Sequence, residues 1–195
     1  MLRNKLFNIL LSSILAGVMI SIGSIAYINV SNSTVGSFLF CIGLLIILHC
    51  KLDLYTGKVP YVTKWNELPY IVTVLIGNLI GCCLMFAFPN NNAVDIMLSK
   101  FNSSYIIIFI EAMLCNILIY VAIEAFKNKH VVITILSVMV FVIAGFEHSV
   151  ASMCFIISSR LFNLNVLLYM IVTIIGNAIG GVLFCRLRRM IGNEI

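Results

Sequence analysis

Residues 145–153 hold the two side chains of this sequence that are best suited to proton or anion chemistry. They read Gly-Phe-Glu-His-Ser-Val-Ala-Ser-Met, so Glu147 and His148 are neighbours in a stretch that is apolar on both sides. An imidazole is the side chain that ordinarily exchanges a proton near neutral pH. Ionisable residues are costly inside a membrane and usually mark functional sites there. We therefore take His148 and Glu147 as the first candidate site residues.

The apolar run before this pair is too short to cross a bilayer as one helix. Residues 131–144 contain only Thr134 and Ser137 as polar side chains. At about 1.5 Å per residue, a helix over this run reaches roughly 21 Å, whereas the hydrocarbon core is about 30 Å thick. A helix that ends at Gly145 beside two ionisable groups is a broken membrane segment. Irregular backbone at that depth needs protein or a water-filled cavity around it.

Composition assigns the whole chain to the membrane. Of its 195 residues, 62% are hydrophobic and 10% are charged, and the mean hydropathy is +1.15. This length suffices for six spans with short loops and leaves no room for a soluble domain. The net charge of +5 comes from basic residues near helix ends, so we predict a lipid bilayer and no nucleic acid as partner. The seven cysteines lack disulfide or metal-ligand spacing and are expected to be small buried hydrophobes.

Six apolar segments organise the chain. The uninterrupted ones cover about residues 6–28, 68–88, 105–126 and 164–185. Residues 35–50 form a helix of only roughly 24 Å before they break into the polar residues 51–60, and the fifth segment breaks similarly at 145–148. Residues 89–104 are the longest polar connection. We predict an all-α integral membrane protein with six transmembrane helices, of which the second and fifth are interrupted by loops.

A short motif indicates that the two halves of the chain are related. Ile-Gly-Asn-x-Ile-Gly occurs at 76–81 and again at 175–180, so Asn177 follows Asn78 by 99 residues (177 minus 78). Paired interrupted segments at matching places in two halves are typical of transporters built from repeats. Because each half has three spans, the second must enter from the opposite side. We predict a single transmembrane domain over residues 1–195, with inverted repeats at about 5–88 and 105–187.

The basic residues indicate how the chain lies in the membrane. With both termini on the cytoplasmic side, ten of the twelve Lys and Arg residues fall inside, and only Lys100 and Arg160 fall outside. This asymmetry satisfies the positive-inside rule for six spans. We therefore predict a multi-pass protein of the plasma (inner) membrane with both termini cytoplasmic.

These motifs resemble the formate/nitrite transporter family. The resemblance rests on Gly145–Met153, on Asp53-Leu54-Tyr55-Thr56, on Leu114-Cys115-Asn116 and on the two Gly-Asn motifs, and it covers roughly residues 5–187. It implies a channel domain with an aquaporin-like inverted repeat. It also implies a homopentamer in which each protomer has its own pore for a small monovalent anion such as formate, nitrite or hydrosulfide. It implies no cofactor, no metal and no enzyme activity. Tyr55, Lys58 and Ser152 depart from the family's usual residues at their positions.

The resemblance also implies roles for individual residues. His148 and Thr56 would face each other at mid-membrane with Asn116 supporting them, and Glu147 would lie behind His148. Leu44, Leu54 and Tyr55 would form the inner constriction, whereas Phe40, Ile119 and Phe141 would form the outer one. Lys100 would stand in the outer vestibule and attract anions.

A bare anion crossing two apolar constrictions faces a large desolvation cost. A proton passed from His148 to a weak-acid anion would let it cross as a neutral acid, and this relay is our leading hypothesis. An aquaporin-like channel for small neutral solutes is the alternative, although paired Asn-Pro-Ala loops are absent from the sequence. An intramembrane enzyme would need a paired nucleophile or a metal motif such as H-E-x-x-H, and neither occurs. A scaffold protein would not need two interrupted helices.

Overall fold

A computed structural model describes residues 2–192 of the chain. Nine α-helices and three short 3-10 helices make up this part, and it contains no strand. The α-helices are α1 (Leu2–Ile28), α2 (Ser33–His49), α3 (Tyr55–Lys58), α4 (Leu68–Cys82), α5 (Asn91–Phe101), α6 (Tyr105–Lys127), α7 (Val131–Ile143), α8 (Ser149–Ser159) and α9 (Leu164–Gly192). The 3-10 helices are η1 (Val59–Tyr61), η2 (Trp65–Glu67) and η3 (Cys83–Ala87). The prediction of an all-α protein is confirmed.

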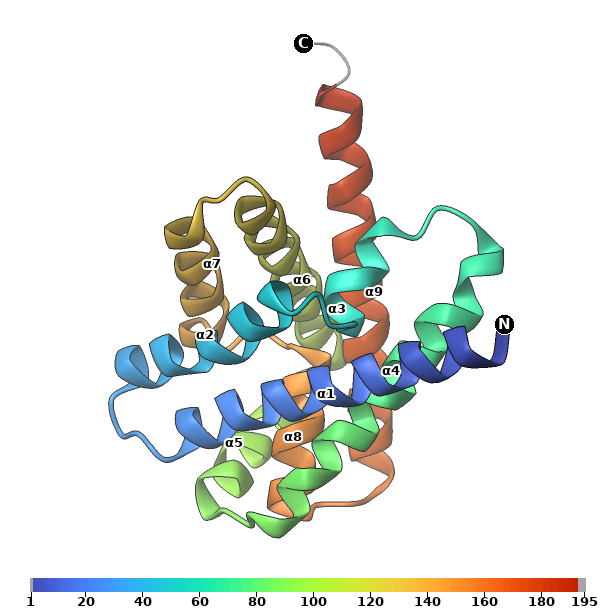
Figure 1. Cartoon of the computed structure of the whole chain (residues 1–195). Helices are drawn as coiled ribbons and strands as arrows, with labels where there is room; N and C mark the ends of the chain where they lie inside the picture. Colours follow the sequence, from blue (N-terminus) through green and yellow to red (C-terminus); the bar gives the residue numbers. More distant parts are fainter. Residues whose placement is uncertain (1, 193–195) are drawn as a thin grey trace.

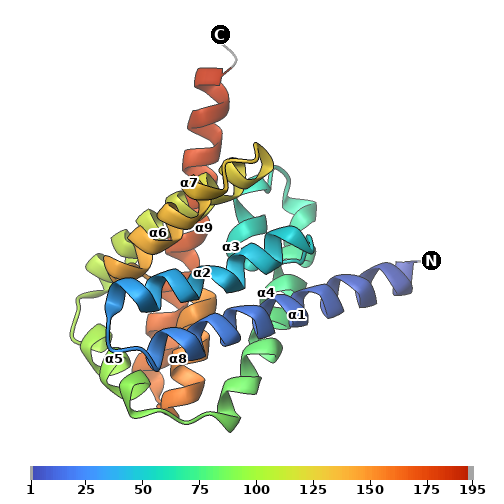
Figure 2. The same cartoon turned by 60° about the vertical axis from the view of Figure 1, so that its left-hand side comes forward.

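The helices pack as two groups around a central half-helix. In the first group α1 packs against α4 and α2, and in the second α6 packs against α9 and α7 (Figure 1). All eleven residues of α8 are buried, and this helix contacts α1, α4, α5 and α9. Figure 2 shows α8 enclosed between these elements. A helix that is covered on every side can present its N-terminal end to the interior of the protein, and that end follows His148 directly.

Glycines allow the closest helix pairs to form. A Cβ at Gly17 of α1 would overlap the backbone carbonyl of Asn78 in α4, and a Cβ at Gly180 of α9 would overlap the carbonyl of Met113 in α6. Small residues at such positions let two helix backbones approach when no hydrophobic effect drives them together in lipid. The glycines beside the two Asn motifs therefore fix the α1–α4 and α6–α9 crossings.

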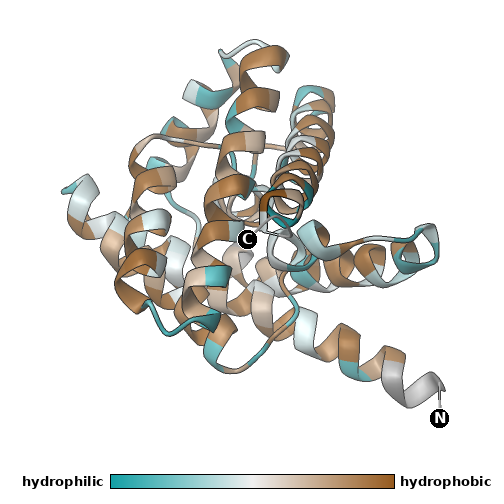
Figure 3. Cartoon of the chain, turned by 90° about the horizontal axis from the view of Figure 1, so that it is seen from above, coloured by the Kyte–Doolittle hydropathy of each residue, from teal (hydrophilic) through white to brown (hydrophobic). Residues whose placement is uncertain are grey.

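Apolar side chains cover the outside of the protein as well as its core. Within residues 2–192, four helical stretches are long and apolar enough to cross a membrane, namely Leu6–Ile28, Trp65–Met85, Tyr105–Lys127 and Leu164–Gly192. Shorter apolar helices are α2, α7 and α8. In Figure 3 hydrophobic colouring follows the helices and hydrophilic colouring gathers mainly at their connections. Large side chains such as Ile106 (73% exposed) and Val132 (68% exposed) point outward, as expected for a multi-pass membrane protein.

Two local predictions need correction. The polar connection at 89–104 contains a helix, α5, because Ala93 and Met97 recur at a helical spacing and are buried against the protein. The cysteines are all free, but only five are buried, whereas Cys50 and Cys83 are exposed. Cys50 follows the last residue of α2 and Cys83 is the first residue of η3, and both face away from the core.

Candidate functional site

The two interrupted segments meet at Thr56 and His148. The chain leaves α2 at His49 and resumes as α3 at Tyr55, and it leaves α7 at Ile143 and resumes as α8 at Ser149. Thr56 and His148 lie at these two restarts and are both buried. The Oγ1 atom of Thr56 and the Nε2 atom of His148 are 3.0 Å apart. One hydrogen bond therefore joins the two breaks at the centre of the protein.

The other ring nitrogen of His148 caps α8. The Ala151 backbone N–H donates to Nδ1 of His148 at 3.0 Å, and His148 is the N-cap residue of this helix. A backbone amide can only donate, so Nδ1 must hold its lone pair here. In the neutral imidazole the proton is then on Nε2, which donates to Thr56 Oγ1. The cap therefore sets both the tautomer and the orientation of the ring.

Two aromatic rings continue from the imidazole toward α2. Phe141 stacks on His148 with ring centroids 5.6 Å apart and an interplanar angle of 14°. Phe40 meets Phe141 edge to face, with centroids 6.1 Å apart. Both phenylalanines are 2% exposed. This row of rings leaves an apolar surface beside the nitrogen atoms of His148.

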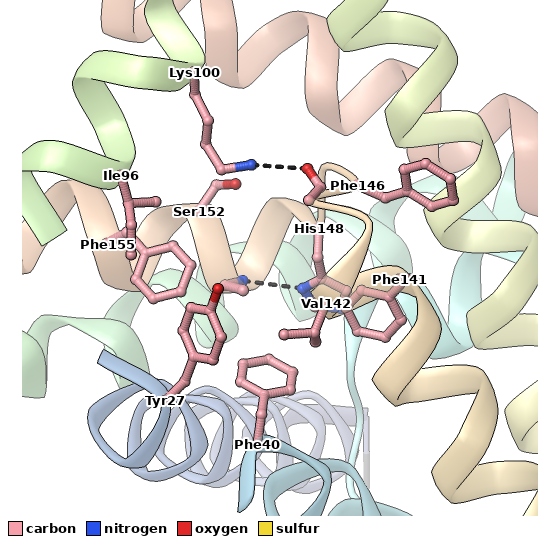
Figure 4. A pocket seen from close by; sticks show the side chains of 12 residues that line it. Tyr27, Phe40, Ile96, Lys100, Phe141, Val142, Phe146, His148, Ser152 and Phe155 are labelled. Carbon is pink, nitrogen blue, oxygen red and sulfur yellow. Dashed lines mark hydrogen bonds between the residues drawn. The ribbon is translucent and has the colours of Figure 1, made fainter. Parts of the chain in front are cut away.

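These rings line a small cavity, which we call the outer cavity. Its volume is about 50 Å³, and its lining includes Phe40, Phe141, His148, Lys100 and Tyr27. Figure 4 shows these side chains with Ile96, Ser152 and Phe155 around the same space. One water needs roughly 10–15 Å³ by this measure. The outer cavity therefore holds a ligand of only a few heavy atoms.

Glu147 is held behind His148 by a polar cluster. The Lys100 Nζ lies 2.8 Å from Glu147 Oε1, and it also donates to the carbonyl of Gly145 at 3.2 Å (Figure 4). The hydroxyl of Tyr169 donates to the other carboxylate oxygen, and the Tyr169 and Ser152 hydroxyls are 2.8 Å apart. Glu147 is 1% exposed. Lys100 thus lines the outer cavity, but as the partner of a buried carboxylate rather than as an isolated charge.

A second, larger cavity, the inner cavity, lies on the α3 side of the Thr56–His148 pair. Its volume is about 630 Å³, and it is lined by apolar residues that include Leu44, Leu54 and Ile123. Lys51, Lys58 and Lys127 add three amines to this lining. Lys58 pairs with Asp53 at 3.0 Å and Lys127 with Glu124 at 2.7 Å. The inner cavity therefore combines apolar walls with a basic mouth.

Tyr55 and Ile119, both expected at the constrictions, are not among the residues of the described chain that line the outer or the inner cavity. The Tyr55 hydroxyl donates to the Ile174 carbonyl at 3.0 Å, so its side chain points toward α9. Ile119 is buried, but in the described part of the chain it is not among the residues that line the outer or the inner cavity. Leu44 and Leu54 line the inner cavity, whereas Phe40 and Phe141 line the outer one.

Asn78 and Asn177 bond the backbone in the same way at the two points where the broken helices resume, Tyr55 and Ser149. The Asn78 Oδ1 atom accepts from the Tyr55 N–H at 2.8 Å, and its Nδ2 donates to the carbonyls of Ser13 and Asp53. The Asn177 Oδ1 atom accepts from the Ser149 N–H at 2.9 Å, and its Nδ2 donates to the carbonyls of Ala112 and Glu147. Each amide satisfies two backbone groups that a break leaves without helical partners. Its third bond goes to a carbonyl of a neighbouring helix, Ser13 in α1 or Ala112 in α6. The repeated motif therefore fixes the position of the Thr56–His148 pair.

Asn116 supports this arrangement indirectly. Its Nδ2 donates to the Asn177 carbonyl at 2.7 Å, and its buried Oδ1 has no hydrogen-bond partner within residues 2–192.

Sequence reasoning did not identify Tyr27, Tyr169 or Ile123 as site residues. Each is an apolar or aromatic residue within an apolar helix, so no local pattern distinguishes it from core residues. In the described chain no group of three or more His, Cys, Asp or Glu residues could hold a metal ion.

Apolar helices surround a buried Thr–His pair that has a cavity on either side, and this arrangement is typical of membrane transport proteins. The chain belongs to the formate/nitrite transporter family, whose sequence model matches residues 1–191. This membership confirms the predicted resemblance and excludes an enzyme, because the family consists of transporters.

Individual relatives support the same assignment. The formate channel FocA of Escherichia coli K12 and its counterpart in strain O157:H7 are each 27% identical over 177 residues, with 72% of this chain and 62% of the relative covered. The chain thus spans less than two thirds of the length of these relatives. Among solved structures, a pentameric formate channel with formate bound has a TM-score of 0.87 at 22% identity, covering 99% of both chains. An FNT family ion channel has a TM-score of 0.88 at 20% identity, covering 97% and 92% of the two chains. These structures share the fold.

Proposed function

We propose that this protein is a transmembrane channel for small monovalent weak-acid anions, and that conduction is linked to a proton through His148. The substrates are formate, nitrite or hydrosulfide. The observation that carries the proposal is the placement of the imidazole, whose Nδ1 edge lies at the outer cavity and whose Nε2 faces Thr56. The names of the relatives, which are formate channels, support the same substrate class.

Lys100 provides the attraction for the anion in this scheme. An ammonium group has three N–H donors, and two of those on Lys100 point at Glu147 and Gly145. The third is left for an anion in the outer cavity. Because Glu147 also accepts from Tyr169 and Ser152, part of its negative charge is compensated without Lys100. The lysine can therefore attract an anion although it is ion-paired.

The proton transfer follows from the two hydrogen bonds of His148. Neutral His148 cannot give up its Nε2 proton without becoming an imidazolate, so it must first take a second proton on Nδ1. That step breaks the bond from the Ala151 N–H. The cationic ring then passes a proton to the anion, which becomes a neutral acid, and the neutral ring caps α8 again. The acid crosses the apolar region at Leu44 and Leu54 and releases its proton at the basic mouth of the inner cavity.

The proposal includes the architecture expected from the sequence. Six spans form inverted repeats at about 5–88 and 105–187, and the matching hydrogen bonds of Asn78 and Asn177 support them. The C-terminal end of α9, the α6–α7 turn and the 59–67 segment lie toward one side in Figures 1 and 2, opposite α5 and the α8–α9 turn. These segments include Lys64, Lys129 and the three arginines near the end of α9. This clustering supports our proposal of cytoplasmic termini in the plasma (inner) membrane. The pentameric state of the solved relative supports a homopentamer.

Flux into proteoliposomes of the purified protein tests this function. Formate, nitrite, hydrosulfide, chloride and glycerol are compared over a pH series, with protein-free liposomes as the control for passage of neutral acids through lipid. We expect fast passage of the weak-acid anions, faster at acidic pH, and none of glycerol. Glycerol flux without anion flux would instead identify the neutral-solute channel. Light scattering of the detergent-solubilised protein measures whether it is a pentamer.

A further inference from the structure

Tyr27 stands between two cavities on the Lys100 side of the protein. Besides the outer cavity there is a second space of about 370 Å³, the outer basin, with Ser31, Ser33 and Asn92 in its lining. Tyr27 and Ile96 line both the outer cavity and the outer basin. A solute that moves from the basin toward His148 therefore passes these two side chains.

One face of α5 follows the same route. Asn92, Ile96 and Lys100 are spaced four residues apart, so they lie on one side of the helix. Asn92 lines the basin, Ile96 lines both spaces and Lys100 lines the outer cavity. The Asn92 Nδ2 atom donates to the carbonyl of Ile28 at 2.7 Å, which ties α5 to the end of α1 next to Tyr27. The two sides of the passage are thus fixed relative to each other.

The ring of Tyr27 is held by its neighbours, whereas its hydroxyl is not. Phe155 and Phe40 pack against the ring with centroid distances of 6.1 and 6.5 Å, and a Cβ at Gly36 would lie 3.1 Å from its Cδ2 atom. Figure 4 shows the hydroxyl pointing into the pocket between these rings. Within residues 2–192 no hydrogen bond involves this hydroxyl. A rigid phenol thus presents a free O–H donor to the passage.

We propose that Tyr27 is a selectivity residue of the pore, whose hydroxyl donates a hydrogen bond to an oxygen of the anion as it passes from the outer basin to the outer cavity. This proposal rests on the proposed function. Oxygen atoms of formate and nitrite are strong acceptors for such a donor, whereas sulfur is a weak one. Tyr27 therefore favours oxyanions over hydrosulfide, and the outer cavity of about 50 Å³ restricts them to a few heavy atoms.

The test compares the wild-type protein with Tyr27→Phe in proteoliposomes, because this change removes only the hydroxyl. We expect formate and nitrite flux to fall by about tenfold, as for loss of a hydrogen bond to a charged group, and hydrosulfide flux by less than about twofold. The pH dependence should stay as in the wild type, since His148 is unchanged. Tyr105→Phe is the matched control, because Tyr105 is an exposed tyrosine and lines neither space.

A second variant tests the passage itself. Ile96→Ala widens it next to Tyr27, and we expect acetate flux to rise relative to formate flux. If Tyr27→Phe leaves the ratio of formate to hydrosulfide flux unchanged in a protein that conducts both, the Tyr27 proposal is wrong and the channel function stands. If the wild-type protein conducts no weak-acid anion, the channel function itself is wrong. An unchanged ratio of acetate to formate flux in Ile96→Ala would place the passage elsewhere.

Discussion

The Nε2 atom of His148 lies 3.0 Å from the Oγ1 atom of Thr56, and this bond links residues that are 92 positions apart in the chain. Each partner sits at the point where a broken helix resumes. The ring is oriented from its other side by the Ala151 N–H. The proposed proton relay and the cap of α8 therefore both depend on the imidazole of His148. Conservative substitutions can test the two roles.

Replacement of His148 by Asn should remove the pH dependence of transport. Asn is a good helix N-cap and can still accept from the Ala151 N–H, so α8 should remain in place, but an amide cannot take up a proton. Wild-type formate flux should rise as the pH falls, because the cationic ring forms on the acidic side, whereas His148→Asn should be slow and flat. Stopped-flow measurement of formate flux between about pH 5 and 8 compares the pH dependence of the two proteins. A variant with the wild-type rate and pH profile would refute the relay.

Thr56 should be replaceable by Ser but not by Val. Val has nearly the same shape and leaves the buried Nε2–H of His148 without its acceptor, which should cost about 1–3 kcal/mol of stability and lower anion flux. Ser keeps the hydroxyl, so Thr56→Ser should retain most of the stability and most of the anion flux. Thermal unfolding in detergent and proteoliposome flux check the two effects. Equal behaviour of Thr56→Val and Thr56→Ser would mean that the hydroxyl is unimportant.

Lys100 and Glu147 should behave as a coupled pair. Lys100→Met leaves a carboxylate that is 1% exposed without its cation, and we expect a loss of about 3–5 kcal/mol. The double variant Lys100→Met/Glu147→Gln removes both charges and should recover most of that stability. Anion flux should stay low in both, because the cation is absent from the outer cavity. The measurement is a double-mutant cycle of thermal stability together with formate flux, and additive stability losses would contradict the pairing.

Asn177 should be essential for the fold around the site. Asn177→Ala removes three hydrogen bonds to buried backbone groups, and we expect a loss of about 2–4 kcal/mol. Asn177→Asp keeps the acceptor for the Ser149 N–H but loses both donated bonds, so it should not rescue the protein. Asn163→Ala is the control, because Asn163 is exposed and, within residues 2–192, its side chain accepts only from the Val166 N–H at the start of α9. Similar melting temperatures of Asn177→Ala and Asn163→Ala would show that the motif does not hold α8.

Much of the site could be anticipated from residue types and spacing. The two breaks follow from apolar runs that are too short to cross the bilayer, and Glu147 and His148 are conspicuous because charged residues are rare in such runs. The family resemblance predicted that Thr56 and His148 face each other, and the structure places them 3.0 Å apart. Phe40 and Phe141 line the outer cavity, and Leu44 and Leu54 line the inner one. The roles of these residues, and of Tyr55 and Ile119, at the constrictions stay predictions, because side-chain direction depends on the rotation of each helix against its neighbours.

The sequence by itself determined the membrane class, the positions of the long apolar helices and the paired Asn motifs, since hydropathy and helix-breaking residues act locally. Only the tertiary structure decided that Lys100 pairs with Glu147, that Tyr169 bonds the same carboxylate and that Tyr27 stands between two cavities. The physical reason is that the long membrane helices carry apolar side chains on their outward faces as well as on their buried ones. Hydropathy therefore places a segment in the membrane but does not select the face that meets a neighbour, which depends on close packing of small residues and on buried hydrogen bonds.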